Sequence, residues 1–212
     1  MPRTAGCAAL SCPTRFIAVA HSDSWRGPAC CAHVALPPQP RAGGGTYFFT
    51  VTLRDRSSDL LVTQIEVLRA AVRRVRARAP FHIDAWVVLP DHMHCLWTLP
   101  DGDADYPARW WAIKAAFSRA LAGKGVPTPG MKRKGERGIW QSRYWEHTIR
   151  DARDYAAHMD YTHFNPVKHG HVARAIDWPY SSFRRCVAAG LYPADWQGNG
   201  EEPEDTGEAT TV

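Results

Sequence analysis

Apolar and polar residues alternate along four short stretches of the chain, and this alternation predicts β-strands. The first stretch, TYFFTVTL at residues 46–53, places apolar side chains on one face and mostly threonines on the other. Residues 82–89 and 92–99 predict two further strands, which are joined by a tight Pro-Asp turn. Residues 139–149, IWQSRYWEHTI, predict the fourth strand.

Apolar residues at helical spacing predict three helices, over residues 63–78, 107–123 and 151–164. Pro80 follows the first helix and Pro166 the third, and each predicts the end of its helix because proline cannot continue the hydrogen-bond pattern. The order of elements is β-α-β-β-α-β-α. It predicts an α+β fold, with one antiparallel sheet and helices packed on it.

The remaining segments have neither a strand period nor a helix period. We interpret residues 1–43 as a disordered leader or an over-long gene start, because their composition is mixed and rich in proline and glycine towards the end. Residues 123–138 hold five glycines, two prolines and five basic residues, which predict a flexible, positively charged loop. We expect residues 44–197 to form the folded domain and residues 198–212 to form an acidic, disordered tail.

An excess of basic side chains favours a polyanionic partner. The net charge of the chain is +5, but its last twelve residues hold five acids and no base. Residues 1–200 therefore carry 26 basic and 16 acidic side chains, a net charge of +10. Lys and Arg supply most phosphate contacts, so this excess suits a nucleic acid, although a solvated basic surface explains it equally well.

Composition also bears on the compartment. No apolar run reaches transmembrane length, and Pro13 and Arg15 interrupt the opening segment, which makes it a poor signal peptide. We therefore expect a cytoplasmic protein that does not bind membranes. The six cysteines form no CxxC pair, and we interpret them as reduced thiols rather than as zinc ligands beside His21 or His33.

Two histidines, His92 and His94, lie one residue apart within the apolar strand over residues 92–99. Side chains alternate along a strand, so both imidazoles project from one face with Cβ atoms roughly 6–7 Å apart. The four apolar residues that alternate with them face the core. Two ring nitrogens at this spacing can share one cation, although histidines with ordinary hydrogen bonds, at the surface or in the core, are the alternative.

The helix over residues 151–164 offers a reacting group and a third metal ligand. Tyr161 and Asn165 are four residues apart and share a helix face, although Pro166 loosens this geometry. An amide oxygen suits Mg²⁺ or Mn²⁺, and a tyrosine beside a metal-bound phosphate can act as a nucleophile. Tyr155 is the rival nucleophile, about 120° around the helix. Packing against the sheet is the alternative for either tyrosine.

Three motifs together resemble those of one protein family. The segments AWVVLPDHMHCLWTLP, HMDYTHFNPVKHG and DWPYSSF are similar to motifs of the single-tyrosine HUH transposases of small insertion sequences, and most of all to their REP-associated branch. The resemblance covers about residues 44–197. The loop over residues 123–138 is longer than is usual in this family.

The resemblance implies a ferredoxin-like HUH domain, related to the RNA-recognition fold, in which His92 and His94 hold Mg²⁺ or Mn²⁺. The family's nucleophile falls on Tyr161, and the polar ligand four residues later falls on Asn165. The implied reaction is cleavage and rejoining of single-stranded DNA at REP-type hairpins through a 5′-phosphotyrosine. It requires no ATP, and the resemblance favours a monomer.

Several basic side chains are predicted to contact the DNA backbone. They are Arg73, Arg74, Arg76, Arg78, Lys132, Arg133, Lys134 and Arg143. Trp110, Trp111 and Tyr144 could stack on splayed bases, with a place in the core as the alternative. We expect DWPYSSF to pack against the domain as a turn.

Two other functions use the same residues. The first is a non-catalytic single-stranded nucleic-acid binding protein with a vestigial metal site, which the complete set of His92, His94, Tyr161 and Asn165 disfavours. The second is a metal-dependent hydrolase of a small phosphate compound. Such a hydrolase uses a metal-bound water, so its activity would survive loss of the tyrosine.

Overall fold

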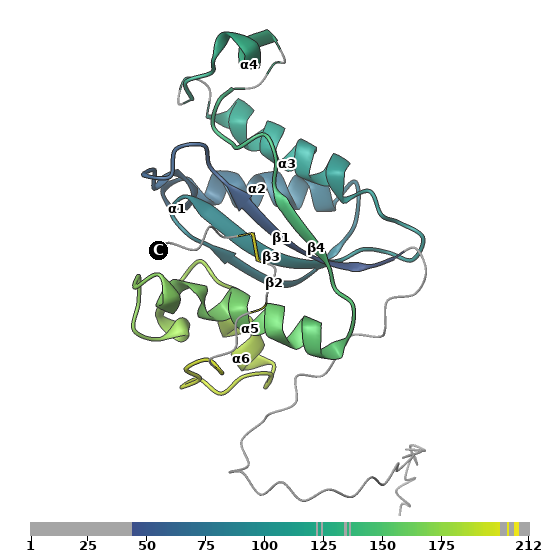
Figure 1. Ribbon diagram of the computed structural model, residues 1–212, viewed down its shortest axis with the longest axis vertical. Helices are drawn as coiled ribbons and strands as arrows, with labels where there is room; N and C mark the ends of the chain where they lie inside the picture. Colours follow the sequence, from purple (N-terminus) through teal and green to yellow (C-terminus); the bar gives the residue numbers. More distant parts are fainter. Residues whose placement is uncertain are drawn as a thin grey trace, which may run out of the picture. The chain divides into compact units, whose positions relative to one another are not determined.

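The computed structural model describes residues 44–121, 123, 125–133, 135, 137–199, 203, 206 and 207. The predicted leader, Lys134 and most of the predicted acidic tail lie outside the described residues. The described elements follow the order β1-α1-α2-β2-β3-α3-α4-β4-α5-η1-α6, which confirms the predicted α+β arrangement and adds short helices (Figure 1). Among these elements, no helix combines the length and the apolar character needed to cross a bilayer.

The four strands form one antiparallel sheet in the order β2-β3-β1-β4. Their bounds are β1 Thr46–Thr52, β2 His82–Val88, β3 His92–Thr98 and β4 Trp145–Thr148. In the central pair, Thr50 lies opposite His94 and Thr52 lies opposite His92. Residues directly opposite each other in a sheet project to the same face, so these threonines and histidines share one face.

Helices α2 (Ile65–Arg76) and α3 (Tyr106–Ala120) cover the other face of the sheet (Figure 1). The predicted apolar faces of β1 and β3 are buried there in one core, as alternation requires. Trp110 of α3 stacks on Trp97 of β3 with ring centroids 4.2 Å apart and is fully buried. Trp110 is therefore a core residue and offers no surface on which a base could stack.

Helix α5 (Ala152–Lys168) lies across the face that carries the histidines, together with η1 (Ala175–Asp177) and α6 (Phe183–Ala188) (Figure 1). A second core forms between these elements and the sheet, and it includes Phe48 and Phe183. The segment DWPYSSF packs against β2 as predicted: Trp178 Nε1 donates to the Val88 carbonyl at 2.9 Å.

Helix α5 begins as predicted but ends later. Asp151 caps its start, since its side chain accepts a hydrogen bond from the main-chain N–H of Asp154 at 2.9 Å. The predicted end at Pro166 is wrong, because the helix continues to Lys168 and the N–H of His169 donates to the Asn165 carbonyl at 3.0 Å. The proline loses one intrahelical bond, and packing against the sheet keeps the helix regular. The extra turn adds Lys168 to the face that carries Tyr161.

Three other boundaries differ from the prediction. The first predicted helix, over residues 63–78, is shorter than expected and spans Ile65–Arg76 as α2; an unpredicted short helix, α1 (Leu60–Thr63), precedes it, and Gln64, with a φ of −113° and a ψ of 31°, separates the two. The predicted flexible loop contains the short helix α4 (Pro129–Arg133). The last predicted strand is interrupted: β4 is only four residues long, Tyr144 before it packs against Phe49 and Trp110, and the pairing reappears as a single bridge between Trp140 and Leu53.

Candidate active site

His92 and His94 project together from β3 onto the face that α5 covers, as the strand period predicts. Their ring centroids lie 5.0 Å apart, and both side chains are buried, which excludes a pair of surface histidines. Strand β3 lies between β2 and β1 and is hydrogen-bonded to both. This pairing fixes the main chain at His92 and at His94.

Hydrogen bonds to the Nδ1 atoms orient both rings. His92 Nδ1 lies 2.7 Å from Asp91 Oδ1, and His94 Nδ1 lies 2.9 Å from Thr50 Oγ1. Thr50 Oγ1 itself donates to the Thr206 carbonyl at 2.6 Å, so towards His94 it acts as the acceptor and Nδ1 carries the proton. In this tautomer Nε2 is the atom through which His94 can bind a cation.

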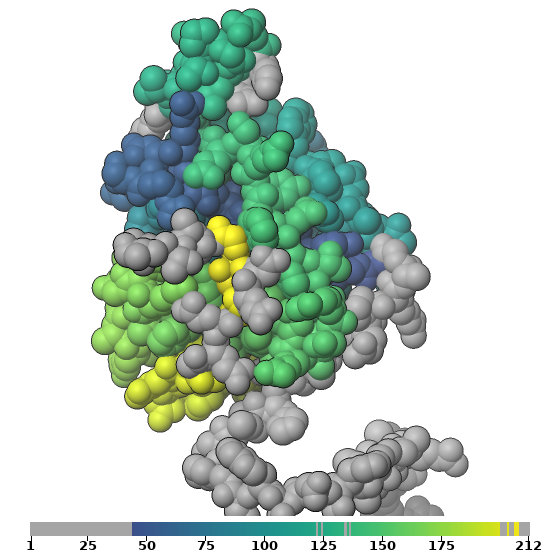
Figure 2. Space-filling view, viewed as in Figure 1, coloured from purple at the N-terminus to yellow at the C-terminus, as the bar shows by residue number. Residues whose placement is uncertain are grey.

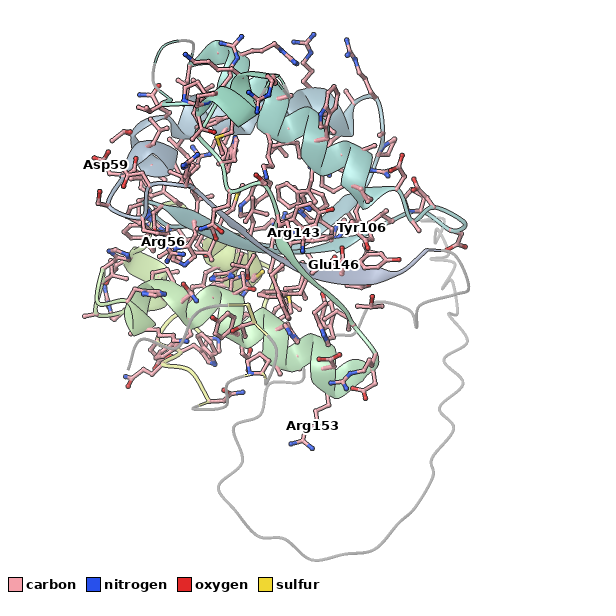
Figure 3. All side chains as sticks on the ribbon, turned by 45° about the horizontal axis from the view of Figure 1, so that its top comes forward. Arg56, Asp59, Tyr106, Arg143, Glu146 and Arg153 are labelled. Atoms are coloured by element: carbon pink, nitrogen blue, oxygen red, sulfur yellow. The ribbon has the colours of Figure 1, made fainter. Side chains whose placement is uncertain are left out.

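Asp91 is held as an anion beside His92. Burial alone would raise the pKa of the Asp91 carboxyl, but the hydrogen bond to His92 and the charges of His92 and Arg56 hold that pKa below its ordinary value. Arg56 forms an ion pair with Asp91 and is half exposed at one end of the sheet (Figure 3). A carboxylate behind a histidine is the arrangement that commonly fixes ring orientation at metal sites.

Tyr161 lies on α5, the helix that packs on the sheet face carrying the histidines, and its ring contacts that of His94. Its ring centroid lies 5.2 Å from that of His94 and 6.0 Å from that of Phe48, in edge-to-face contacts. Asn165, one helical turn later on the same face, is completely buried. The fold therefore brings Tyr161 directly against the His92–His94 pair and places Asn165 on the helix face that carries it.

Tyr155 points to a different part of the sheet. Its hydroxyl donates to Asp84 Oδ1 of β2 at 3.3 Å. Burial, and then the charge and hydrogen bond of Asp84, raise the pKa of Tyr155 far above that of an ordinary phenol. Both observations make Tyr155 a poor nucleophile compared with Tyr161.

Two residues next to this site were not predicted from the sequence. The Lys168 ammonium lies 4.8 Å from the centroid of the Tyr161 ring, and the ring centroid of His169 lies 5.2 Å from that of His92. Lys168 is seven residues after Tyr161, two helical turns, and this spacing would have indicated it had the helix been extended past Pro166. Asp91 could have been found from its place directly before His92.

Another group of possible metal ligands lies nearby on the same face. In the part of the chain that the structure describes, His147, Asp154 and His158 are the one set of three His, Cys, Asp or Glu side chains whose ligand atoms all lie within 4.8 Å of one another. The predicted ligands His92, His94 and Asn165 are a different set from this group. This group was not predicted from the sequence.

The basic residues predicted to contact DNA lie in three separate places. Arg73, Arg74, Arg76 and Arg78 are exposed on or just after α2, across the sheet from Tyr161. Arg76 also donates to the Phe81 carbonyl at 3.1 Å, so part of its role is structural. A cavity of about 350 Å³ between α2 and α3 is lined by Arg74, Arg78 and the exposed Trp111, and it contains none of the residues around Tyr161.

The other predicted contacts lie towards β4. Lys132 and Arg133 are exposed on α4, which projects from the top of the molecule in Figure 2. Arg143 is exposed just before β4 and is labelled in Figure 3. Tyr144 is half-buried in the core rather than displayed for stacking. The basic surface is thus spread over three regions of the fold instead of forming one patch.

Comparison with known proteins identifies the family. No family model matches the chain. A REP-associated tyrosine transposase of Escherichia coli K12 is 53% identical over 156 residues, covering 74% of this chain and 87% of that protein. A relative from Haemophilus influenzae is 46% identical over 157 residues, covering 74% of this chain and 89% of its own length.

A solved structure agrees with these relatives. It is a REP-associated tyrosine transposase bound to a REP hairpin, and it matches with a TM-score of 0.68 and 48% identity over 81% of this chain and 96% of that one. The structural comparison and the sequence comparison therefore point to the same family. The chain belongs to the REP-associated tyrosine transposases.

Proposed function

We propose that this transposase cleaves and rejoins single-stranded DNA at REP-type hairpins, with Tyr161 as the nucleophile. The observation that carries the proposal is the contact between the Tyr161 ring and the His94 ring, 5.2 Å apart, beside His92. A hairpin substrate is supported by the related structure, which contains a REP hairpin.

The reaction exchanges one phosphodiester bond for another. Tyr161 Oη loses its proton and attacks the phosphorus, the bond from phosphorus to the 3′ oxygen breaks, and that oxygen takes up a proton. The product is a 5′ phosphate joined to Tyr161 and a free 3′ hydroxyl. A second 3′ hydroxyl then attacks this phosphotyrosine and releases the tyrosine, so no nucleotide hydrolysis is needed.

The residues around the histidine pair fit a divalent cation. Two imidazoles with engaged Nδ1 atoms and the buried amide of Asn165 form a mixed nitrogen and oxygen donor set that suits Mn²⁺ or Mg²⁺. His92, His94 and Asn165 would hold the ion, which when bound would polarise the scissile phosphate as a Lewis acid. Asp91 and Thr50 keep both rings in place.

An end-labelled hairpin oligonucleotide tests the proposal. Wild-type protein should form a covalent adduct that survives a denaturing gel, and only the fragment 3′ of the cut should remain attached, because the tyrosine captures the 5′ phosphate. Tyr161→Phe should bind the hairpin normally but give no adduct and no free 3′ end. Tyr155→Phe is the matched control and should retain most cleavage, since its hydroxyl bonds Asp84 instead.

The same experiment separates the other two functions. A non-catalytic binding protein would give no adduct even with wild-type protein. A small-phosphate hydrolase would keep its activity in Tyr161→Phe. An adduct on the fragment 5′ of the cut would contradict the proposed polarity.

A further inference from the structure

A group of three side chains lies beside the proposed active site, on the far side of Phe48. His147 of β4 lies opposite Phe48 in the sheet, and Asp154 and His158 come from α5; we call these three residues the strand–helix cluster. The Phe48 ring centroid lies 5.6 Å from His94 and 4.7 Å from His158. Phe48 therefore separates the cluster from the His92–His94 pair.

The donor atoms of the cluster already stand at distances close to those of a coordination shell. His147 Nε2 lies 2.8 Å from Asp154 Oδ2, and His158 Nδ1 lies 3.1 Å from Asp154 Oδ1. The three ligand atoms all lie within 4.8 Å of one another, and ligand atoms around a tetrahedral ion at about 2.1 Å stand roughly 3.4 Å apart, so side-chain shifts can bring the three to a common ion. The two rings are nearly parallel with centroids 4.6 Å apart, and a modest rotation of each would turn the nitrogens towards a shared ion.

The carboxylate at the centre of the cluster is held in place by the main chain. The Arg150 N–H donates to Asp154 Oδ2 at 2.9 Å and so orients the carboxylate. A carboxylate that is already oriented by a main-chain donor loses little freedom when it binds a metal ion.

The spacing of the three residues also suits coordination. Asp154 and His158 are four apart on one helix, which places both side chains on the same face. His158 Nδ1 lies 2.8 Å from the Asp154 carbonyl oxygen, so an ion that replaced the Nδ1 proton would find a further oxygen close by. His147 reaches the same point from β4 and remains 12% exposed, which leaves room for a water ligand.

We propose that the strand–helix cluster is a second metal site, which takes a borderline transition ion such as Zn²⁺. Two imidazoles and one carboxylate are a common ligand set for this class of ion and a poor one for Mg²⁺. An ion at this site would connect β4 with α5, because its ligands come from both elements. Tyr161 follows His158 by three residues on the same helix. A bound ion therefore fixes the position of the helix that faces His92 and His94. The proposal stands without the proposed strand cleavage, because it concerns binding of the ion alone.

The test is a Co²⁺ titration of metal-free protein, followed by visible absorption and by metal analysis. The four cysteines in residues 1–31 are first replaced by serine, so that thiolates cannot contribute. His92→Ala/His94→Ala protein should still bind one Co²⁺ per chain with d–d absorption. Adding His158→Gln should abolish that band, and so should adding His147→Gln.

Controls keep the outcome interpretable. His82→Gln is the matched control, because His82 Nδ1 also lies 3.1 Å from a carboxylate, that of Asp84, but outside the cluster. It should leave Co²⁺ binding unchanged. In protein that keeps His92 and His94, His147→Gln/His158→Gln should remove one equivalent of bound Co²⁺ and the rise in thermal midpoint that Zn²⁺ produces, while circular dichroism in EDTA matches the parent.

Two results would overturn the proposal. One is a His92→Ala/His94→Ala protein that keeps its fold by circular dichroism and binds no Co²⁺. The other is undiminished Co²⁺ binding after both cluster histidines are replaced. In either case, the cluster is only an ion-pair network between β4 and α5.

Discussion

The ammonium of Lys168 lies over the ring of Tyr161, 4.8 Å from its centroid, on the last turn of α5. A cation at this position favours the phenolate that the proposed attack requires, and it can also contact the phosphate that receives the attack. The turn that supplies Lys168 exists only because α5 continues through Pro166.

Lys168→Gln should slow adduct formation by about a hundredfold, the usual cost of losing one stabilising group at a developing charge. The pH–rate profile should move to more alkaline pH, because the phenolate loses a neighbouring cation. Lys168→Arg should restore most of the rate, which a merely structural role would not predict. Lys114→Gln is the control, since Lys114 lies over the Trp140 ring at 5.9 Å on the other face of the sheet. An unchanged rate and profile in Lys168→Gln would exclude this role.

Asp91→Asn should weaken Mn²⁺ binding at the His92–His94 pair without weakening hairpin binding. Asparagine can still accept the hydrogen bond at Nδ1 of His92 but lacks the charge, and loss of such a partner costs roughly 10–100-fold in metal affinity. The measurement is the Mn²⁺ concentration that gives half-maximal cleavage. Arg56→Gln removes the other partner of Asp91 and should change this concentration little. Equal Mn²⁺ requirements for Asp91→Asn and wild type would show that the carboxylate does not tune the site.

Stability at acid pH should depend on Asp103. Its carboxylate pairs with the buried Arg109, whose NH1 donates to Oδ1 at 3.0 Å. Hydrogen bonds from Arg109 and from the Asp105 N–H, with the charge of Arg109, hold the pKa of Asp103 below its ordinary value. A lowered folded-state pKa adds stability above the unfolded value, and this stability is lost as pH falls through the folded value.

Asp103→Asn should therefore lower the urea midpoint at neutral pH, and its difference from wild type should shrink as the pH falls towards about 3. Asp101→Asn, in the same loop, is the matched control. A pH-independent difference would mean that Asp103 acts through packing alone.

The sequence predicted β1, β2 and β3 and their faces well, because alternation is a local property of the chain, whereas the fourth strand was predicted too long. The face shared by His92 and His94 follows directly from the period of two, and the 5.0 Å separation of their ring centroids confirms it. The signal for the start of α5 is equally local, because Asp151 and Asp154, which form the cap, lie within one helical turn.

What the sequence could not supply depends on contacts between distant segments. Packing against the sheet carries α5 past Pro166, and the prediction that ended the helix there excluded Lys168 from the site. The strand–helix cluster requires β4 to pair with β1 at the edge of the sheet, where His147 meets α5. Nothing in the local pattern indicates this order of strands. For the same reason, the position of the α2 arginines across the sheet from Tyr161 could not be foreseen.

Hairpin binding should depend on salt through two separate basic surfaces. Arg73 and Arg74 of α2 are exposed across the sheet from Tyr161, whereas Lys132 and Arg133 lie on α4. If these side chains contact the hairpin stem, Arg73→Gln/Arg74→Gln and Lys132→Gln/Arg133→Gln should each weaken binding. Each pair should also reduce the slope of log affinity against log salt by roughly 0.9 for every duplex phosphate contact that is lost. Cleavage at saturating DNA should stay near wild type, because neither pair lies beside Tyr161.

The matched control removes two arginines that acidic neighbours already pair. Arg69 lies 2.6 Å from Glu66, and Arg174 lies 2.8 Å from Asp177. Arg69→Gln/Arg174→Gln therefore removes two positive charges, as each test variant does, but these two arginines are already engaged by carboxylates and are less available to phosphate. Its slope, measured between about 50 mM and 200 mM KCl, should match that of wild type. If only the α4 pair changes the slope, the stem lies along the α4 end of the molecule. If neither pair does, none of these four side chains contacts a DNA phosphate, and the hairpin lies away from both surfaces.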